Sequence, residues 1–131
     1  MPLVDISRAQ LDDLIAHARD EAPNECCGYM TIKEGSVEQV VRARNERESP
    51  YGYQLDADAQ LKAWRLAEDD GYEIAVYHSH PRSAPEPSQT DINLAVFPEW
   101  LQVIVSLAGE PEARVWRIAD GHVEEEPLTV D

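Results

Sequence analysis

Apolar residues recur along the chain with two different spacings, one typical of helices and the other of strands. In the first segment the spacing is helical, with apolar residues at Leu11, Leu14, Ile15 and Ala18. Ser7 and Gln10 form the signature of a capping box, and Pro23 ends the pattern. We therefore expect a first helix that begins after Ser7, with His17 at the edge of its apolar stripe as a surface or packing residue.

Strand-like runs fill most of the remaining chain. Residues 26–44, CCGYMTIKEGSVEQVVRAR, predict a hairpin that turns at Glu34-Gly35-Ser36. Residues 72–80, YEIAVYHSH, form a nearly continuous apolar run, which is typical of a strand covered on both faces. LQVIVSL at 101–107 and ARVWRI at 113–118 predict two more strands, and DGHVEEEP at 120–127 predicts a turn and an edge strand with His122 facing solvent.

Two further helices are expected between these strands. The second runs from about Asp56 to Asp70 and ends at Gly71, and a short third helix begins near Ser88 in SQTDINLAV, residues 88–96. Helices that alternate with strands predict a mixed α/β (α+β) fold, in which a central sheet has helices packed against it. At 131 residues the chain is expected to form a single domain over 1–131.

Composition and charge exclude several functional classes. The net charge of −15 argues against nucleic acid as a partner and favours a basic partner surface. No apolar run approaches the roughly 18 residues of a membrane span, and MPLVDISRAQ lacks the features of a signal peptide. We therefore expect a soluble, cytoplasmic protein with no membrane partner. Cys26 and Cys27 are adjacent and would point to opposite faces of a strand, so two buried free thiols are expected.

The segment AVYHSHPRSAPEPSQTD, residues 75–91, contains the candidate chemistry. His78 and His80 lie two residues apart at the end of an expected strand, so both imidazoles face the same side. Pro81 ends the strand directly after them. Two histidines supply two nitrogen ligands, and a tetrahedral zinc site needs at least a third ligand.

Asp91 is the candidate third ligand. Ser88-x-x-Asp91 is also the signature of a capped helix, and without the histidines this would be the preferred interpretation. The two interpretations are compatible, because a helix capped at Ser88 would place Asp91 on its first turn, within reach of the strand end. Two histidines and an aspartate would leave one zinc position for water, as in catalytic sites, and zinc lowers the pKa of that water toward about 7. A second carboxylate should then move the proton, but 26 acidic residues leave several candidates.

Two motifs resemble the JAMM (MPN+) zinc metalloprotease family. HSHPRSAPEPSQTD, residues 78–91, resembles the family's His-x-His-Pro…Ser-x-x-Asp motif, and PNECCGYM, residues 23–30, resembles its upstream Pro-x-Glu-x-Cys-Gly segment. The expected order of elements, ending in VWRIADG at 115–121, also fits. The resemblance implies an MPN/JAMM-like fold, a cytidine-deaminase-like mixed sheet flanked by helices, of the small prokaryotic type. Deaminase chemistry itself is not expected, because no Pro-Cys-x-x-Cys segment follows the histidines.

The resemblance also implies a role for each site residue. His78, His80 and Asp91 would be the ligands of one catalytic Zn²⁺ with a bound water. Glu25 would be the general base and acid, lying on the first strand beside that water, and Ser88 would donate a hydrogen bond to the oxyanion of the tetrahedral intermediate. Without the motif, Glu25 would be read as a solvated residue before a strand.

Family members cleave the bond after the C-terminal Gly-Gly tail of a ubiquitin-like protein, so the resemblance implies a ubiquitin-like or sulfur-carrier partner. FPEWLQV at 97–103 and RNERESPYGYQLD at 44–56 are short, which favours a prokaryotic-type enzyme without the long insertion of eukaryotic deubiquitinases. Residues 82–87 and 51–53 are expected to wall the cleft. A zinc hydrolase of a small amide and a noncatalytic MPN-type interaction module are the alternatives. The sequence leaves open whether the bond is peptide or isopeptide, and whether the protein is a monomer or a homodimer.

Overall fold

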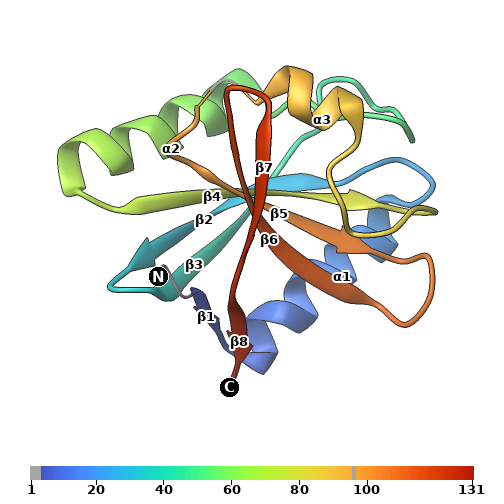
Figure 1. The fold of residues 1–131 in the computed structure, drawn as a ribbon, viewed down its shortest axis with the longest axis horizontal. Coiled ribbons are helices and arrows are strands. Elements are labelled where there is room, and N and C mark those ends of the chain that lie inside the picture. The colour runs from blue at the N-terminus through green and yellow to red at the C-terminus, as the bar shows by residue number, and fades with distance from the viewer. Residues whose placement is uncertain (1–3, 96) are drawn as a thin grey trace.

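Eight strands form one mixed sheet in the computed structural model, which describes residues 4–95 and 97–131 (Figure 1). The elements are β1 (Val4–Ile6), α1 (Arg8–Glu21), β2 (Cys27–Lys33), β3 (Ser36–Ala43), α2 (Ala57–Asp70), β4 (Glu73–His80), α3 (Gln89–Leu94), β5 (Leu101–Ser106), β6 (Glu112–Ala119), β7 (His122–Glu126) and β8 (Leu128–Val130). The strand order is β7-β6-β5-β4-β2-β3-β1-β8. The predicted mixed α/β class, with helices flanking a central sheet, is therefore confirmed.

The helices begin and end where the sequence predicts. Ser7 caps α1 in a capping box with Gln10, and the side chain of Asp56 accepts a hydrogen bond from Ala59 N at the start of α2. Gly71 ends α2 in the left-handed conformation, with φ 72°, which a residue without Cβ adopts at little cost. The third helix extends over Gln89–Leu94 after its N-cap Ser88, while Val96 of the predicted segment lies outside the described residues.

The predicted hairpin and edge strand are also present. β2 and β3 pair antiparallel, and Glu34 and Gly35 at the turn both have positive φ. β4 is buried from Ile74 onward, because strands pair on both sides of it and helices cover both of its faces. β7 lies at the end of the strand order, and its first residue, His122, is exposed.

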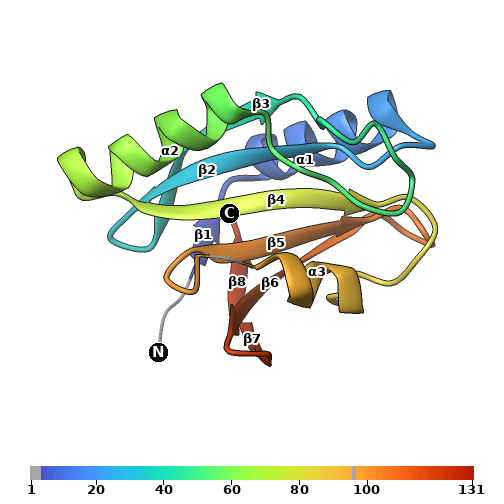
Figure 2. The same cartoon turned by 90° about the horizontal axis from the view of Figure 1, so that it is seen from above.

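Two short strands were not predicted. β1 and β8 are three residues each, too short to show a periodic pattern, and they pair with each other in parallel. β7 and β8 lie at opposite ends of the strand order although only Pro127 separates them in the chain. The sheet therefore curls strongly, and its two ends approach each other (Figure 2).

Alternation along the strands gives the sheet two separate apolar cores. In Figure 1, α1 lies below the sheet and α2 and α3 lie above it. On β4, Ala75 and Tyr77 belong to the core under α1, whereas Ile74 and Val76 belong to the core under α2. Cys26 and Cys27 lie in different cores as free, buried thiols, as predicted.

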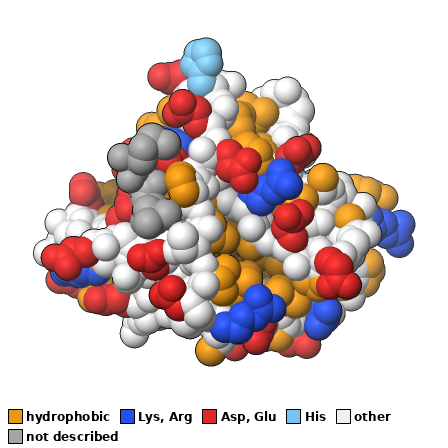
Figure 3. Space-filling model, turned by 60° about the horizontal axis from the view of Figure 1, so that its bottom comes forward, with side chains coloured by type: hydrophobic (Ala, Val, Ile, Leu, Met, Phe, Trp, Pro, Cys, Tyr) orange, Lys and Arg blue, Asp and Glu red, His pale blue; other side chains and the backbone are white. Residues whose placement is uncertain are grey.

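The surface of the protein is predominantly acidic. Figure 3 shows the lower side of the molecule, where acidic side chains are spread widely and basic ones occur singly or in small groups. Apolar side chains gather near the centre of this face. Within the described residues, no helix has both the length and the apolar character that crossing a membrane requires.

Candidate active site

The C-terminal end of β4 presents two histidines on the face covered by α2 and α3. Because side chains two residues apart share a face, His78 and His80 both point to this side, and their Nε2 atoms lie 3.2 Å apart. Both imidazoles are almost fully buried. The expected arrangement of the pair, at the end of a strand that opens into a loop, is present.

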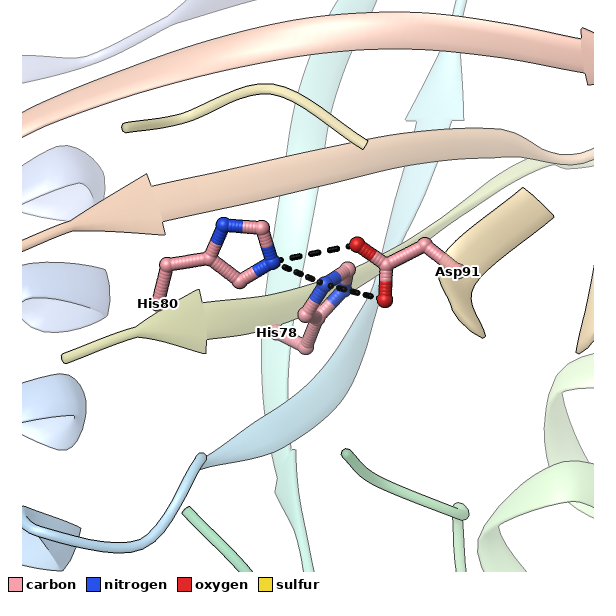
Figure 4. A group of neighbouring side chains, drawn as sticks. All are labelled: His78, His80 and Asp91. Atoms are coloured by element: carbon pink, nitrogen blue, oxygen red, sulfur yellow. Dashed lines mark hydrogen bonds and ion pairs between the residues drawn. The ribbon is translucent and has the colours of Figure 1, made fainter. Parts of the chain in front are cut away.

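Asp91 reaches the same point from α3 (Figure 4). One carboxylate oxygen lies 3.2 Å from His78 Nε2, and the other lies 3.0 Å from His80 Nε2. Asp91 is also the third residue of α3, where its backbone N–H donates to Ser88 Oγ and its carboxylate accepts from Ser88 N. The helix cap therefore fixes the carboxylate that meets the two imidazoles.

The loop after β4 orients His80. Its Nδ1–H donates to the carbonyl oxygen of Ala84 at 2.8 Å, because a carbonyl can only accept. Trp116 Nε1–H donates to Pro85 O, and Ser106 Oγ–H donates to Ser83 O, which fixes the loop. With Nδ1 protonated, the neutral His80 ring has its Nε2 lone pair directed at Asp91.

The three facing groups form a good donor set for a divalent cation. Burial lowers the pKa of His78, which favours the neutral ring that a metal requires. Burial alone would raise the pKa of Asp91, but hydrogen bonds with both histidines keep it well below its usual range. Burial also opposes protonation of His80, yet the hydrogen bonds to Asp91 and Ala84 leave its pKa raised.

A divalent cation between the three groups could take the place of the proton that the raised pKa of His80 favours. One ligand atom from each of His78, His80 and Asp91 lies within 4.8 Å of the others. Without a positive charge between them, two nitrogen lone pairs and a carboxylate would face one another in a buried site. Two imidazole nitrogens and one carboxylate suit zinc, and three protein ligands leave one position open.

Tyr53 and Gln102 form one wall of the site. The Tyr53 ring stacks on His78 with centroids 4.3 Å apart, and its hydroxyl donates to Gln102 Oε1 at 3.3 Å. The sequence predicted residues 51–53 as a wall of the cleft, but it gave no sign of this stacking. The ring restricts the orientation of His78, whose Nδ1 has no hydrogen-bond partner in the described part of the chain.

Glu25 lies in the loop before β2, which corrects the prediction that it would lie on the first strand. The first strand is β1, and regular pairing in β2 begins only at Cys27. Glu25 is 5% exposed, and its Oε1 has no hydrogen-bond partner among the residues that the structure describes. Burial raises the pKa of Glu25 to about 7. The nearby charge of His80 lowers this pKa, and the charge of Asp91 raises it.

A groove of about 330 Å³ runs along β4 beside the histidines. Val76, two residues before His78 on the same face, forms part of it, and Tyr53 and Gln102 line it next to the site. Its further lining residues include Leu55, Leu94, Phe97 and Trp100. Arg47, Gln54 and Gln60 also line it, so the groove has a mixed polar and apolar lining and adjoins the site through Tyr53, which stacks on His78.

Comparison with known proteins gives the family. The sequence model of one protein family, described as prokaryotic homologs of the JAB domain, matches residues 7–119. The chain belongs to this family. The resemblance found in the two motifs is confirmed by a match that extends far beyond them.

Two relatives of this JAB-domain protein have named activities. It is 41% identical to the CysO-cysteine peptidase of Mycobacterium tuberculosis, over 95% of this chain and 90% of the relative. It is 34% identical to the desampylase of Haloferax volcanii, over 80% of this chain and 81% of the relative. The protein is a peptidase of the JAMM type. This confirms the prediction that it is an enzyme, and the alternative of a noncatalytic interaction module is set aside.

Solved structures agree on the fold. A solution structure from Desulfitobacterium hafniense superposes with a TM-score of 0.84 at 30% identity, covering 98% of this chain and 92% of the other. A JAB1/MPN domain protein from Archaeoglobus fulgidus gives a TM-score of 0.60 at 16% identity, with 96% of each chain covered. The JAB-domain protein therefore has the MPN-type fold that its motifs imply.

Proposed function

We propose that this protein is a zinc-dependent peptidase or isopeptidase that hydrolyses the bond after the C-terminal Gly-Gly tail of a ubiquitin-like or sulfur-carrier protein. His78, His80 and Asp91 would hold the zinc, with Glu25 and Ser88 as catalytic residues. The observation that carries the proposal is the convergence of three lone-pair donors, beside a groove whose lining residue Tyr53 stacks on His78.

Glu25 would move the proton of the reaction. Zinc at this site would polarise a water molecule and lower its pKa toward about 7. Glu25 would take a proton from the attacking water and pass it to the leaving nitrogen as the C–N bond breaks and the water oxygen bonds to the carbonyl carbon. The second water proton would also end on that nitrogen, so the products are a carboxylate on the tail and a protonated amine. A carboxyl group with a pKa near 7 can both accept and return a proton at neutral pH.

Ser88 would stabilise the negative charge that develops on the carbonyl oxygen. Its Oγ accepts from Asp91 N at 3.1 Å, so its own hydroxyl proton remains free to donate to substrate. Ser88 is exposed, unlike the three donor residues, and a substrate can therefore reach it. Capping and catalysis are compatible, because they use different parts of the same hydroxyl.

The groove supports an extended tail as the substrate. Glycines next to the scissile bond would let the backbone approach the buried site closely. Two relatives are named as a CysO-cysteine peptidase and a desampylase. The net charge of −15 would favour a basic surface on a carrier protein bound as substrate.

Intact-mass spectrometry of a small cleavage panel tests the proposal. The zinc-loaded protein meets ubiquitin-fold substrates that carry either a linear extension after Gly-Gly or a lysine-linked conjugate. Cutting of the linear substrate alone indicates carrier maturation, and cutting of the conjugate indicates deconjugation. If neither is cut while zinc is bound, a small amide substrate replaces the proposed one.

Single substitutions test the assigned roles. Glu25→Gln should keep stoichiometric zinc and lose nearly all turnover, with Glu68→Gln, at an exposed position in the last turn of α2, as the control for the same change. His80→Ala should lose zinc and activity together, with the exposed His122→Ala as its control. Full zinc content in His80→Ala would remove His80 from the ligand set.

A further inference from the structure

Asn45 has a buried side chain that makes four hydrogen bonds. It is 7% exposed and lies two residues after the end of β3, at the start of the loop 45–55. Its Nδ2 donates to Glu25 O at 2.9 Å and to Gly52 O at 3.1 Å. Its Oδ1 accepts from Arg47 N at 3.0 Å and from Gln54 N at 3.1 Å. Two carbonyls face the amide nitrogen and two N–H groups face the oxygen, so the amide fits in one orientation only.

The loop 45–55 holds the backbone of Glu25 in place through hydrogen bonds. Besides the Asn45 contact to its carbonyl, the Glu25 N–H donates to Ser49 O at 2.9 Å, so the same loop binds both backbone polar groups of Glu25. The Glu25 Oε1, by contrast, has no hydrogen-bond partner within residues 4–95 and 97–131. The position of the carboxylate therefore depends on its backbone, and the backbone depends on the loop.

The loop also carries Tyr53, whose ring stacks on His78. Tyr53 lies between Gly52 and Gln54, both of which bond to the Asn45 side chain. One buried amide thus connects the residue proposed as general base with the ring that flanks a proposed zinc ligand. No pattern in the sequence identified Asn45, because a single asparagine in a polar loop is indistinguishable from a turn residue.

We propose that Asn45 is a positioning residue, which sets the location of Glu25 through its carbonyl and fixes the loop that bears Tyr53. The proposal rests on the proposed function, since it takes Glu25 to be the base. Asn45 touches neither substrate nor metal. Its effect on turnover passes through Glu25, and a displacement of the base by about 1 Å can lower the rate by about 10²-fold.

Asn45→Asp is the sharpest perturbation. It preserves size and the acceptor oxygen facing Arg47 and Gln54, but it replaces the donor facing the two carbonyls with a second oxygen. Asn45→Ser, which is smaller and has a hydroxyl in place of the amide, provides a second variant that introduces no charge. Asn93→Asp is the control, because the same chemical change falls on an exposed residue of α3.

The first measurement combines zinc content with steady-state kinetics on the cleaved substrate. Asn45→Asp should retain one zinc per chain and a KM within about twofold of the parent, with kcat lower by about 10²-fold. In the Glu25→Gln background, the same substitution should change the residual turnover by less than about twofold, because the group it positions is already lost. An equal loss in both backgrounds would show that Asn45 acts independently of Glu25 and would overturn the proposal.

The second measurement needs no active enzyme. Amide hydrogen exchange of the metal-free protein should show faster exchange at Glu25 N–H in Asn45→Asp and in Asn45→Ser, with the amides of β4 unchanged. Unchanged exchange at Glu25 in both variants would refute the positioning role. If Glu25→Gln cleaved the substrate as fast as the parent enzyme, the proposed function would be refuted instead, whatever the exchange data show.

Discussion

Gly28 lies where the Tyr77 ring and the Val41 carbonyl leave no room for a side chain. It pairs with Tyr77 across the β2–β4 ladder and with Arg42 across the β2–β3 ladder. A Cβ built on Gly28 would lie 2.5 Å from Tyr77 Cζ and closer still to Tyr77 Cε2 and the Val41 carbonyl oxygen. Tyr77 is fully buried, and its hydroxyl lies 2.7 Å from His17 Nδ1. The Gly28→Ala substitution therefore requires movement of a fixed ring and of backbone.

The expected cost follows from these contacts. Ordinary van der Waals contact lies at 3.4–4 Å, so the methyl group needs a displacement of about 1 Å in a packed core. Overpacking of this kind costs roughly 1–3 kcal/mol, and weakening the buried bond between His17 and Tyr77 adds about 1 kcal/mol. We expect Gly28→Ala to lower the free energy of unfolding by about 2–4 kcal/mol.

Urea denaturation of the metal-free protein, followed by circular dichroism, measures this loss. Gly109→Ala is the matched control, because a Cβ there meets nothing within 4 Å. Tyr77→Leu combined with Gly28→Ala should recover part of the loss if the ring is the obstacle. A Gly28→Ala midpoint equal to that of Gly109→Ala would show that β2 and β4 accommodate the methyl group and that the packing argument is wrong.

Three further predictions concern pH, the helix cap and the loop that orients His80. Burial lowers the pKa of His17 to about 4, so the unfolded chain binds more protons between pH 4 and 6.5, and stability should fall on acidification across this window. Urea titrations at pH 7 and 5 should show a drop of about 1–2 kcal/mol that His17→Gln reduces. Ser88→Ala should lower turnover by about 10²–10³-fold and stability by about 1 kcal/mol; intact turnover with reduced stability would leave only the capping role. Trp116→Phe removes the bond to Pro85 O and should weaken zinc affinity by about tenfold in chelator competition, and an unchanged affinity would show that the loop holds without it.

Much of the fold is predictable because local signals and tertiary packing agree. Ser7, Asp56 and Ser88 each precede an amphipathic segment, and each caps a helix in the structure. The buried strand β4 is visible as an apolar run because both of its faces are covered. β1 and β8 are different, since each pairs in parallel with the other across most of the chain length, and three residues contain no repeat that could reveal it.

The candidate site divides in the same way. His78, His80 and Asp91 are predictable together, because strand alternation and helix capping each place a side chain within a short segment. Glu25 is separated from them by some fifty residues, so only the family motif points to it. Asn45 has neither a motif nor a period, since its role depends on loop geometry that no local pattern encodes.

Alternation along β4 separates the residues that stabilise the fold from those that form the site. Tyr77 and Ser79 face α1 or the neighbouring strand: Tyr77 contacts His17, and Ser79 Oγ accepts from Cys26 N at 2.8 Å. His78 and His80 face the other side, where both meet Asp91 and His78 also stacks on Tyr53. Burying two imidazoles and a carboxylate costs stability, and the apolar core under α1, on the opposite face, offsets that cost. A polar site can therefore occupy the end of the buried strand β4 because the same strand contributes to a separate core one residue away.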